Sequence, residues 1–390
     1  MRDTDALKHL KRAAAELAEI RRGKEFAQWN EYEKHHLDSE LADSEPFRSW
    51  RDTFIFTGDG AFVTANGRFG PWAIGRLVSR LSAEEVLAAF HAEITRNSVV
   101  YSEVMPLFGV QIDAPCQLAD GVTVEPWPDD LFQAYARNLW STELRSPPEG
   151  TSFLRQVYTV TPAFERRTDD TAAPTISALT TPPRATRDAM RERVRLACLL
   201  ASVGPVECPL TALRPDRAAL FVAGDLNLSE RPGLSRPIPP CPVEASALKI
   251  AFEALSGFRK ASILERAINR LGRSRIAGND VDRALELGMS AEIALMYGQD
   301  ASNTEITYKI GSRAAWLLGE DPETRAGVFA GMKALYSARS EAVHAGVLKR
   351  GAAVDLEASD RLVARILTAL AQHDDFPDWQ TLVLGGHPTT

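Results

Sequence analysis

Near its C-terminus the chain reads Lys333-Ala-Leu-Tyr-Ser-Ala-Arg-Ser-Glu-Ala-Val-His-Ala-Gly346. Apolar residues recur here at helical spacing and a glycine follows, so the segment predicts the last turns of an amphipathic helix. Arg339 lies five residues before His344 in this helix. A guanidinium binds phosphate through forked donors, and an imidazole exchanges protons near neutral pH. Together these two groups can cut RNA without a metal.

The surrounding C-terminal half is predicted to be helical, because apolar residues recur at three- and four-residue spacing. Five helical segments are expected at residues 244–273, 278–297, 304–318, 322–346 and 355–373. A further helix at 187–202 precedes them, across a proline-rich stretch. The loops between the five segments are short, which favours antiparallel neighbours in a helical bundle.

The N-terminal part mixes helix and strand signals. Residues 5–36 repeat apolar side chains at helical spacing without a proline, and Ser82 with Glu85 predicts a capped helix that ends near Arg96. Short strands are expected at 54–56 and 62–64, as a hairpin, and at 99–110, 122–124 and 153–160. These signals predict an α+β domain.

The boundary between the two parts is predicted in the stretch 161–188, which is rich in Thr, Pro and Asp. We expect an α+β domain over residues 1–180, an all-α domain over 181–375 and a C-terminal tail over 376–390. The length of 390 residues supports two domains, because it exceeds what one hydrophobic core usually organises.

The composition, 45% hydrophobic and 25% charged, is that of an ordinary soluble globular protein. No apolar run approaches the length of a membrane span, and the first residues lack the apolar core of a signal peptide. The four cysteines are scattered, so neither a structural zinc site nor a disulfide framework is expected. We expect a cytoplasmic protein that needs no cofactor and no metal.

The net charge of −7 argues against a protein that coats DNA non-specifically, because lysine and arginine dominate phosphate binding. Arginines nevertheless concentrate between Arg259 and Arg283. They leave room for a local basic surface that binds RNA, although a solvated helix face is the plainer interpretation.

Several segments of the C-terminal half occur in a characteristic order. They are Leu264-Glu-Arg-Ala-Ile-Asn-Arg270, Asp280-Val-Asp-Arg-Ala-Leu-Glu286, Ser290-Ala-Glu-Ile-Ala-Leu295, Thr307-Tyr-Lys-Ile-Gly-Ser-Arg-Ala-Ala-Trp-Leu-Leu318, Glu323-Thr-Arg325, Leu335-Tyr336, and Arg339-Ser340 with His344. In this order they resemble the ApeA-like branch of the HEPN superfamily, over residues 185–373. The sequence departs from the family at Ala345, where a glycine often follows the histidine. It also lacks the tyrosine two places after His344 on which control by nucleotidylation depends.

The resemblance implies a metal-independent endoribonuclease with an Arg-x(4–6)-His motif. Arg339 and His344 would be the catalytic pair, and Ser340 the polar residue after the arginine. Family members dimerise so that two motifs meet in one cleft, which implies a homodimer through the helical domain. Relatives act in antiphage defence by abortive infection, so the substrate would be host RNA, with transfer RNA one possibility. The N-terminal domain, which resembles nothing, would guide the substrate or sense a phage-derived trigger.

Two further residues are candidates for supporting roles. Glu292 lies in an apolar helix, where an unpaired charge is costly; it could orient Arg339 or His344, or form an ion pair with Arg313. Tyr336 could stack on a base, or could be a core or dimer-interface residue. The rival functions are a non-catalytic HEPN module that binds a nucleotide, an RNA or a protein, and a structural dimerisation scaffold.

Overall fold

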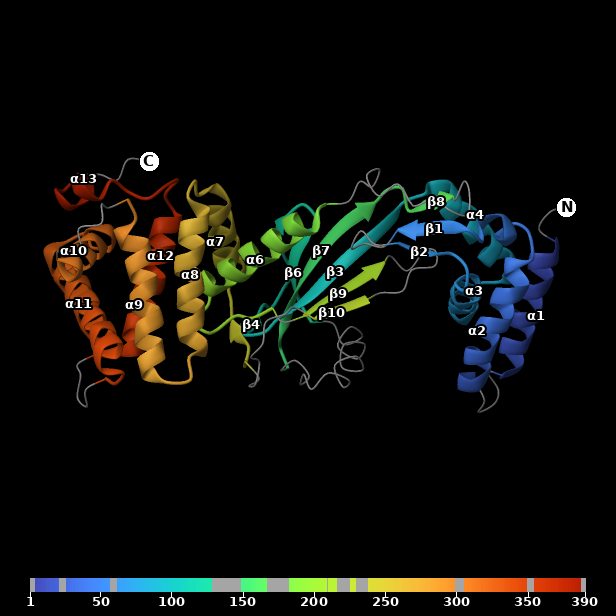
Figure 1. The fold of residues 1–390 in the computed structure, drawn as a ribbon, viewed down its shortest axis with the longest axis horizontal. Helices are drawn as coiled ribbons and strands as arrows, with labels where there is room; N and C mark the ends of the chain where they lie inside the picture. The colour runs from blue at the N-terminus through green and yellow to red at the C-terminus, as the bar shows by residue number, and fades with distance from the viewer. Residues whose placement is uncertain are drawn as a thin grey trace. The chain divides into compact units, whose positions relative to one another are not determined.

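A computed structural model describes residues 4–20, 26–56, 62–127, 149–166, 182–208, 210–215, 225–228, 238–298, 305–348 and 354–386. Along the chain, an α+β region is followed by a helical region, as the sequence predicts (Figure 1). The chain divides into two compact units. Unit 1 comprises residues 1–104, 156–187 and 211–227, and unit 2 comprises 105–155, 188–210 and 228–390.

Unit 1 contains helices and a small antiparallel sheet. These elements are α1 (Thr4–Ile20), α2 (Phe26–Ala42), η1 (Phe47–Trp50), β1 (Thr53–Phe56), β2 (Phe62–Thr64), α3 (Phe69–Val78), α4 (Ala83–Arg96) and β8 (Phe164–Arg166). The strand order is β2-β1-β8. The predicted hairpin is confirmed, because β1 pairs antiparallel with β2. The predicted capping box is confirmed too: the Ser82 hydroxyl accepts from the Glu85 amide, and the Glu85 carboxylate accepts from the Ser82 amide.

A larger sheet has the strand order β10-β9-β3-β7-β6-β5. Its strands, with the short β4 and β11, are β3 (Val99–Leu107), β4 (Val110–Gln111), β5 (Cys116–Ala119), β6 (Val122–Pro126), β7 (Ser152–Val160), β9 (Leu210–Pro215), β10 (Asp225–Leu228) and β11 (Cys241–Pro242). The strands predicted at 122–124 and 153–160 are confirmed. The strand predicted at 99–110 is two strands, because Gly109 between them has φ +87°.

The units differ from the contiguous domains expected at residues 1–180 and 181–375. The chain passes from one unit to the other inside β3, after Val104, and inside β7, after Arg155. The stretch 161–188, expected to be a linker, contributes β8 and the start of helix α6 (Arg184–Ala201). Strand β8 pairs with β1, a partner more than a hundred residues earlier that local composition does not reveal. Residues 167–181 of this stretch lie outside the described residues.

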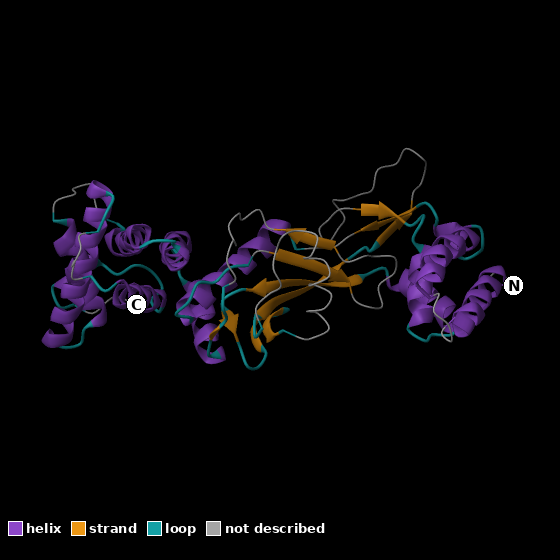
Figure 2. Cartoon of the chain, turned by 90° about the horizontal axis from the view of Figure 1, so that it is seen from below, coloured by secondary structure: helices purple, strands orange, loops and turns teal. Residues whose placement is uncertain are grey.

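From residue 245 onward every described element is a helix, as the secondary-structure colours in Figure 2 show. The helices are α7 (Ala245–Gly257), α8 (Ala261–Ile276), α9 (Asp280–Met296), α10 (Ile306–Leu318), α11 (Pro322–Ala345), α12 (Leu356–Ala371) and α13 (Trp379–Val383). Four of the five predicted segments are confirmed as α9, α10, α11 and α12. The prediction of one helix over 244–273 is wrong, because Phe258 is extended and the Arg259 amide donates to the Asp374 carbonyl.

The expected C-terminal tail differs from the structure as well. Residues 376–386 include α13, whose Trp379 and Leu382 are buried in the hydrophobic core of unit 2. The Arg313 guanidinium lies 5.2 Å from the centre of the Trp379 ring. This segment is therefore part of the packed structure of the helical region.

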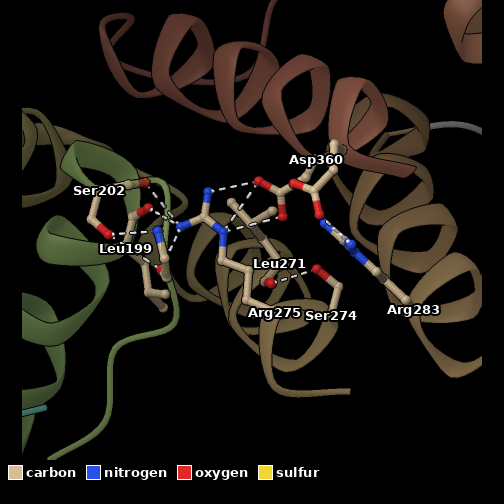
Figure 3. Close-up of polar contacts among 9 residues, drawn as sticks. Leu199, Ser202, Leu271, Ser274, Arg275, Arg283 and Asp360 are labelled. Atoms are coloured by element: carbon tan, nitrogen blue, oxygen red, sulfur yellow. Dashed lines mark hydrogen bonds and ion pairs between the residues drawn. The ribbon is translucent and has the colours of Figure 1, made fainter. Parts of the chain in front are cut away.

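A buried arginine joins three parts of unit 2 (Figure 3). Arg275, on α8, pairs with Asp360 of α12 at 3.0 Å, and the two side chains are 3% and 6% exposed. The guanidinium also donates to the carbonyls of Leu199, Ser202 and Gly204, where α6 ends. Because all three guanidinium nitrogens donate hydrogen bonds, the pair fixes the end of α6 against α8 and α12.

Candidate functional site

The candidate site lies on α9 and α11. Helix α9 has α8 on one side and α11 on the other (Figure 1). Toward α8, the Ser290 hydroxyl donates to the Ala267 carbonyl at 2.7 Å. Toward α11, Gly288 meets the side chain of Arg339. Gly288 and Ser290 lie two residues apart, or about 200° around the helix, so the two neighbours pack on nearly opposite sides of α9.

Helix α11 presents Arg339 beside its buried face. That face consists of Val328, Met332, Leu335, Ala338 and Ala342. The helix starts at an Asp321 N-cap and ends at Gly346 with φ +66°, which places His344 in the last turn, as predicted. Arg339 thus leaves the helix next to the core, while His344 lies about 140° further round, toward solvent.

Arg339 forms an ion pair with Glu292 of α9. Its Nη2 lies 3.1 Å from Glu292 Oε2, and the two side chains are 25% and 34% exposed. The contact lacks hydrogen-bond geometry: Glu292 Oε2 and Arg339 Nε are both buried and have no hydrogen-bond partner among the described residues. A buried donor without a partner costs about 1–3 kcal/mol. An incoming oxygen ligand can reach only the exposed part of the guanidinium, because Nε itself is buried.

Tyr336, one turn before Arg339, completes this group. The Arg339 guanidinium lies 5.4 Å from the centre of the Tyr336 ring, within range of a cation–π contact. Burial, and after it the Glu292 carboxylate, raise the pKa of the Tyr336 hydroxyl, which Arg339 opposes. The phenol stays protonated at neutral pH, so Tyr336 offers a ring face and a hydroxyl but no base.

The structure thus decides among the three partners expected for Glu292, which are Arg339, His344 and Arg313. Arg313, one alternative partner, lies on α10 and donates to the Leu295 carbonyl of α9. Its guanidinium is buried, and burial lowers its pKa. Arg313 ties α10 to α9, while Glu292 approaches Arg339.

His344 and Ser340 are not brought into the same group. His344 is exposed and makes no hydrogen bond or ion pair with any residue that the structure describes. Ser340 is half-buried and follows Arg339 directly in α11. Within one chain, Arg339, Glu292 and Tyr336 form a cluster, and the imidazole of His344 stands apart from it.

Gly288 is a residue of the site that the sequence analysis missed. An ideal Cβ on Gly288 would lie 2.4 Å from Cγ and 2.7 Å from Cβ of Arg339. These atoms are close to the α11 backbone, so they cannot move aside without shifting the helix. Gly288 therefore sets the close approach of α11 to α9. A glycine in the middle of a helical pattern is the available signal, since it weakens a helix without a packing reason.

The side of α9 that faces away from the core is apolar. It carries the half-buried Leu285 and Met289, together with Ile293 and Met296, which are also packed against the core of unit 2. Met289 lies two residues from the buried Ala291, about 200° around the helix, which sets the outward direction of this face. We call these four residues the α9 outer face. Glu292 lies at its edge, on the side of α11.

Comparisons of the chain with protein-family models, with curated proteins and with solved structures find no match. The resemblance to HEPN proteins therefore rests on the sequence motifs alone. Among the described residues, no three His, Cys, Asp or Glu side chains group so that they could hold a metal ion. None of the described helices has the length and apolar character needed to span a membrane.

Proposed function

We propose that this protein is a metal-independent endoribonuclease of the HEPN type, acting in the cytoplasm in antiphage defence. One observation carries the proposal: Arg339 is held against Glu292 while its side chain stays partly exposed, and an exposed His344 ends the same helix. A partly exposed guanidinium is suited to bind a phosphate through its forked donors. An accessible imidazole is suited to move a proton near neutral pH.

In the proposed reaction, His344 accepts the proton of a ribose 2′-hydroxyl, and that oxygen attacks the adjacent phosphorus. Arg339 stabilises the negative charge on the non-bridging oxygens. The bond to the leaving 5′-oxygen breaks, and this oxygen takes a proton from a second imidazole. The products are a 2′,3′-cyclic phosphate and a 5′-hydroxyl end. Glu292 orients the guanidinium, and the Tyr336 ring supports it from one side.

The second imidazole is the reason to propose a homodimer. Arg339 and His344 of one chain point about 140° apart, so one chain does not surround a phosphate with both groups. A second copy would supply His344 from the opposite side. Both groups lie on α11, so we expect the two copies to meet through the helical domain.

The test is an RNA cleavage assay in EDTA with total transfer RNA and an unstructured RNA. We expect the wild type to leave cyclic-phosphate ends. Arg339→Ala should lower the rate ~10²–10³-fold, the size of one electrostatic donor, and His344→Ala ~10²–10⁴-fold, the size of one acid–base group. His35→Ala, which removes an exposed histidine from α2, is the matched control and should cut like wild type.

Each outcome separates the proposal from its rivals. Equal cleavage by wild type and His344→Ala would remove His344 from the mechanism. RNA binding without cleavage, at any dimer concentration, would favour the non-catalytic module instead. Unchanged antiphage protection by folded Arg339→Ala and His344→Ala dimers would favour a scaffold.

A further inference from the structure

Helix α8 carries two arginines that make no contact with an acidic side chain among the described residues. Arg266 and Arg273 are both exposed, and neither forms a hydrogen bond or ion pair with the residues that the structure describes. They are seven residues apart, which is within ~20° of two full helical turns and ~10 Å along the axis. Both side chains therefore leave α8 in the same direction.

The acids that contact α8 do not neutralise these two arginines. Each of the three pairs with another arginine: Glu286 with Arg270, Asp360 with Arg275, and Glu192 with Arg195. In a chain of net charge −7, the α8 face thus presents two free guanidinium groups. We call Arg266 and Arg273 the α8 arginine pair.

The α8 arginine pair faces the same side of the helical region as the α9 outer face. Helix α12 packs on both α8 and α9. It meets α8 at Arg275, two residues and about 200° from Arg273, so Arg273 points away from α12. Met289 on α9 also points away from the core that α12 covers.

Arg266 also lies level with the candidate site along the bundle. The Ser290 hydroxyl bonds to Ala267, the neighbour of Arg266, and Glu292 is about half a turn beyond Ser290. The axes of α8 and α11 are two helix spacings apart, or roughly 16–20 Å. A dinucleotide bound at Arg339 does not span that distance, whereas a longer RNA strand does.

We propose that the α8 arginine pair binds the sugar–phosphate backbone of the RNA that is cut at Arg339 and His344. This inference rests on the proposed ribonuclease function. Arginine donates two parallel hydrogen bonds to a phosphate, and these contacts position a strand without reading its sequence. The surface would hold long substrates across α9 and leave the choice of cut site to the residues around Arg339.

The experiment measures RNA binding to the full-length His344→Ala protein, which keeps the RNA intact, by fluorescence anisotropy over a range of salt concentrations. Arg266→Gln with Arg273→Gln should lower affinity for a 20-nucleotide single strand roughly 20-fold at 0.1 M salt. The slope of log affinity against log salt should become shallower by ~1.4, because each lost contact to a single strand removes ~0.7.

The matched control is Arg361→Gln with Arg365→Gln on α12. These arginines are exposed as well. The double substitution changes the net charge by the same amount as Arg266→Gln with Arg273→Gln. Each lies two residues from a buried core residue, Val363 or Leu367, so both face away from α8 and α9. We expect this variant to bind RNA with wild-type affinity and slope.

Unchanged affinity and slope in the α8 double variant would overturn the inference, and so would an equal loss in the α12 control. Cleavage of a dinucleotide by the wild type is measured alongside, since it tests Arg339 and His344 alone. If the dinucleotide is cut but the α8 variant binds RNA normally, only the α8 surface is wrong. If wild type neither binds nor cuts RNA, both proposals fail.

Discussion

Two arginine–carboxylate pairs join helices in the same region of the molecule, and their surroundings differ. Arg275 and Asp360 are 3% and 6% exposed, and the guanidinium also donates to three backbone carbonyls (Figure 3). Arg339 and Glu292 are 25% and 34% exposed, and each has a buried atom without a hydrogen-bond partner among the described residues. The first pair is saturated, and the second is partly exposed.

This difference separates a structural role from a chemical one. A buried ion pair that satisfies all its partners fixes a fold, because removing one member leaves a charge without solvent or partner. A partly exposed pair contributes little to stability, about 0–1 kcal/mol. Its exposure is what makes the guanidinium accessible to a ligand. Helix contacts alone would not distinguish the two arginines.

The largest expected effect is on stability, at Arg275. Arg275→Met keeps the aliphatic stem but leaves Asp360 buried and unpaired, so we expect a loss of about 3–5 kcal/mol. Arg339→Met, the matched substitution at the other pair, should cost about 1 kcal/mol or less. Urea denaturation followed by tryptophan fluorescence measures both, since Trp316 and Trp379 belong to the helical region.

If both variants unfolded at the same urea concentration, the two ion pairs would not differ in their contribution to stability. The RNA assay sharpens the comparison. Under the proposed function, Arg339→Met loses more activity than Arg275→Met, although it loses less stability. Arg339→Met should be folded and inactive. Arg275→Met should retain activity per folded molecule at temperatures where it stays folded.

Much of the fold follows from local sequence. The capping box at Ser82 and Glu85 and the glycine end of α11 at Gly346 are chemical signals within a few residues of the element they terminate. The break between α7 and α8 has a weaker signal, the Ser256-Gly257 pair at the end of α7, and it was overlooked in the sequence. Phe258 is extended because its ring packs on Phe376, 5.1 Å away between ring centres, from the far end of the chain.

The site was also predictable only in part, because contacts between segments far apart in the sequence decide the rest of it. Sequence spacing placed Arg339 and His344 on one helix, but left Arg339, His344 and Arg313 all open as the partner of Glu292. The choice depends on how α9 is rotated against its neighbours, and that rotation is fixed by packing at Gly288. The pairing of Arg275 with Asp360 joins residues 85 apart, which no local pattern encodes.

The next largest effect on stability is expected at Gly288, where a substitution can remove the close approach of α9 and α11. Gly288→Ala places a methyl group against Arg339, and we expect the overpacking to cost about 1–3 kcal/mol. Gly327→Ala on α11 is the control, because nothing lies within 4 Å of its added carbon. That variant should gain about 0.5–1 kcal/mol from helix propensity. Effects of the same sign would show that Gly288 has no packing role.

The smallest expected effect on stability is at Glu292. Substitutions at this position test what its carboxylate does for Arg339. Glu292→Gln keeps the shape and removes the charge, so stability should change by less than about 1 kcal/mol. If Glu292 orients Arg339, kcat/KM for RNA should fall roughly tenfold, because a guanidinium held less firmly stabilises the transition state less. Glu292→Asp, which keeps the charge, should recover part of the loss. A rise in kcat/KM for Glu292→Gln would instead mean that the carboxylate competes with phosphate for Arg339, making the ion pair an inhibitory contact.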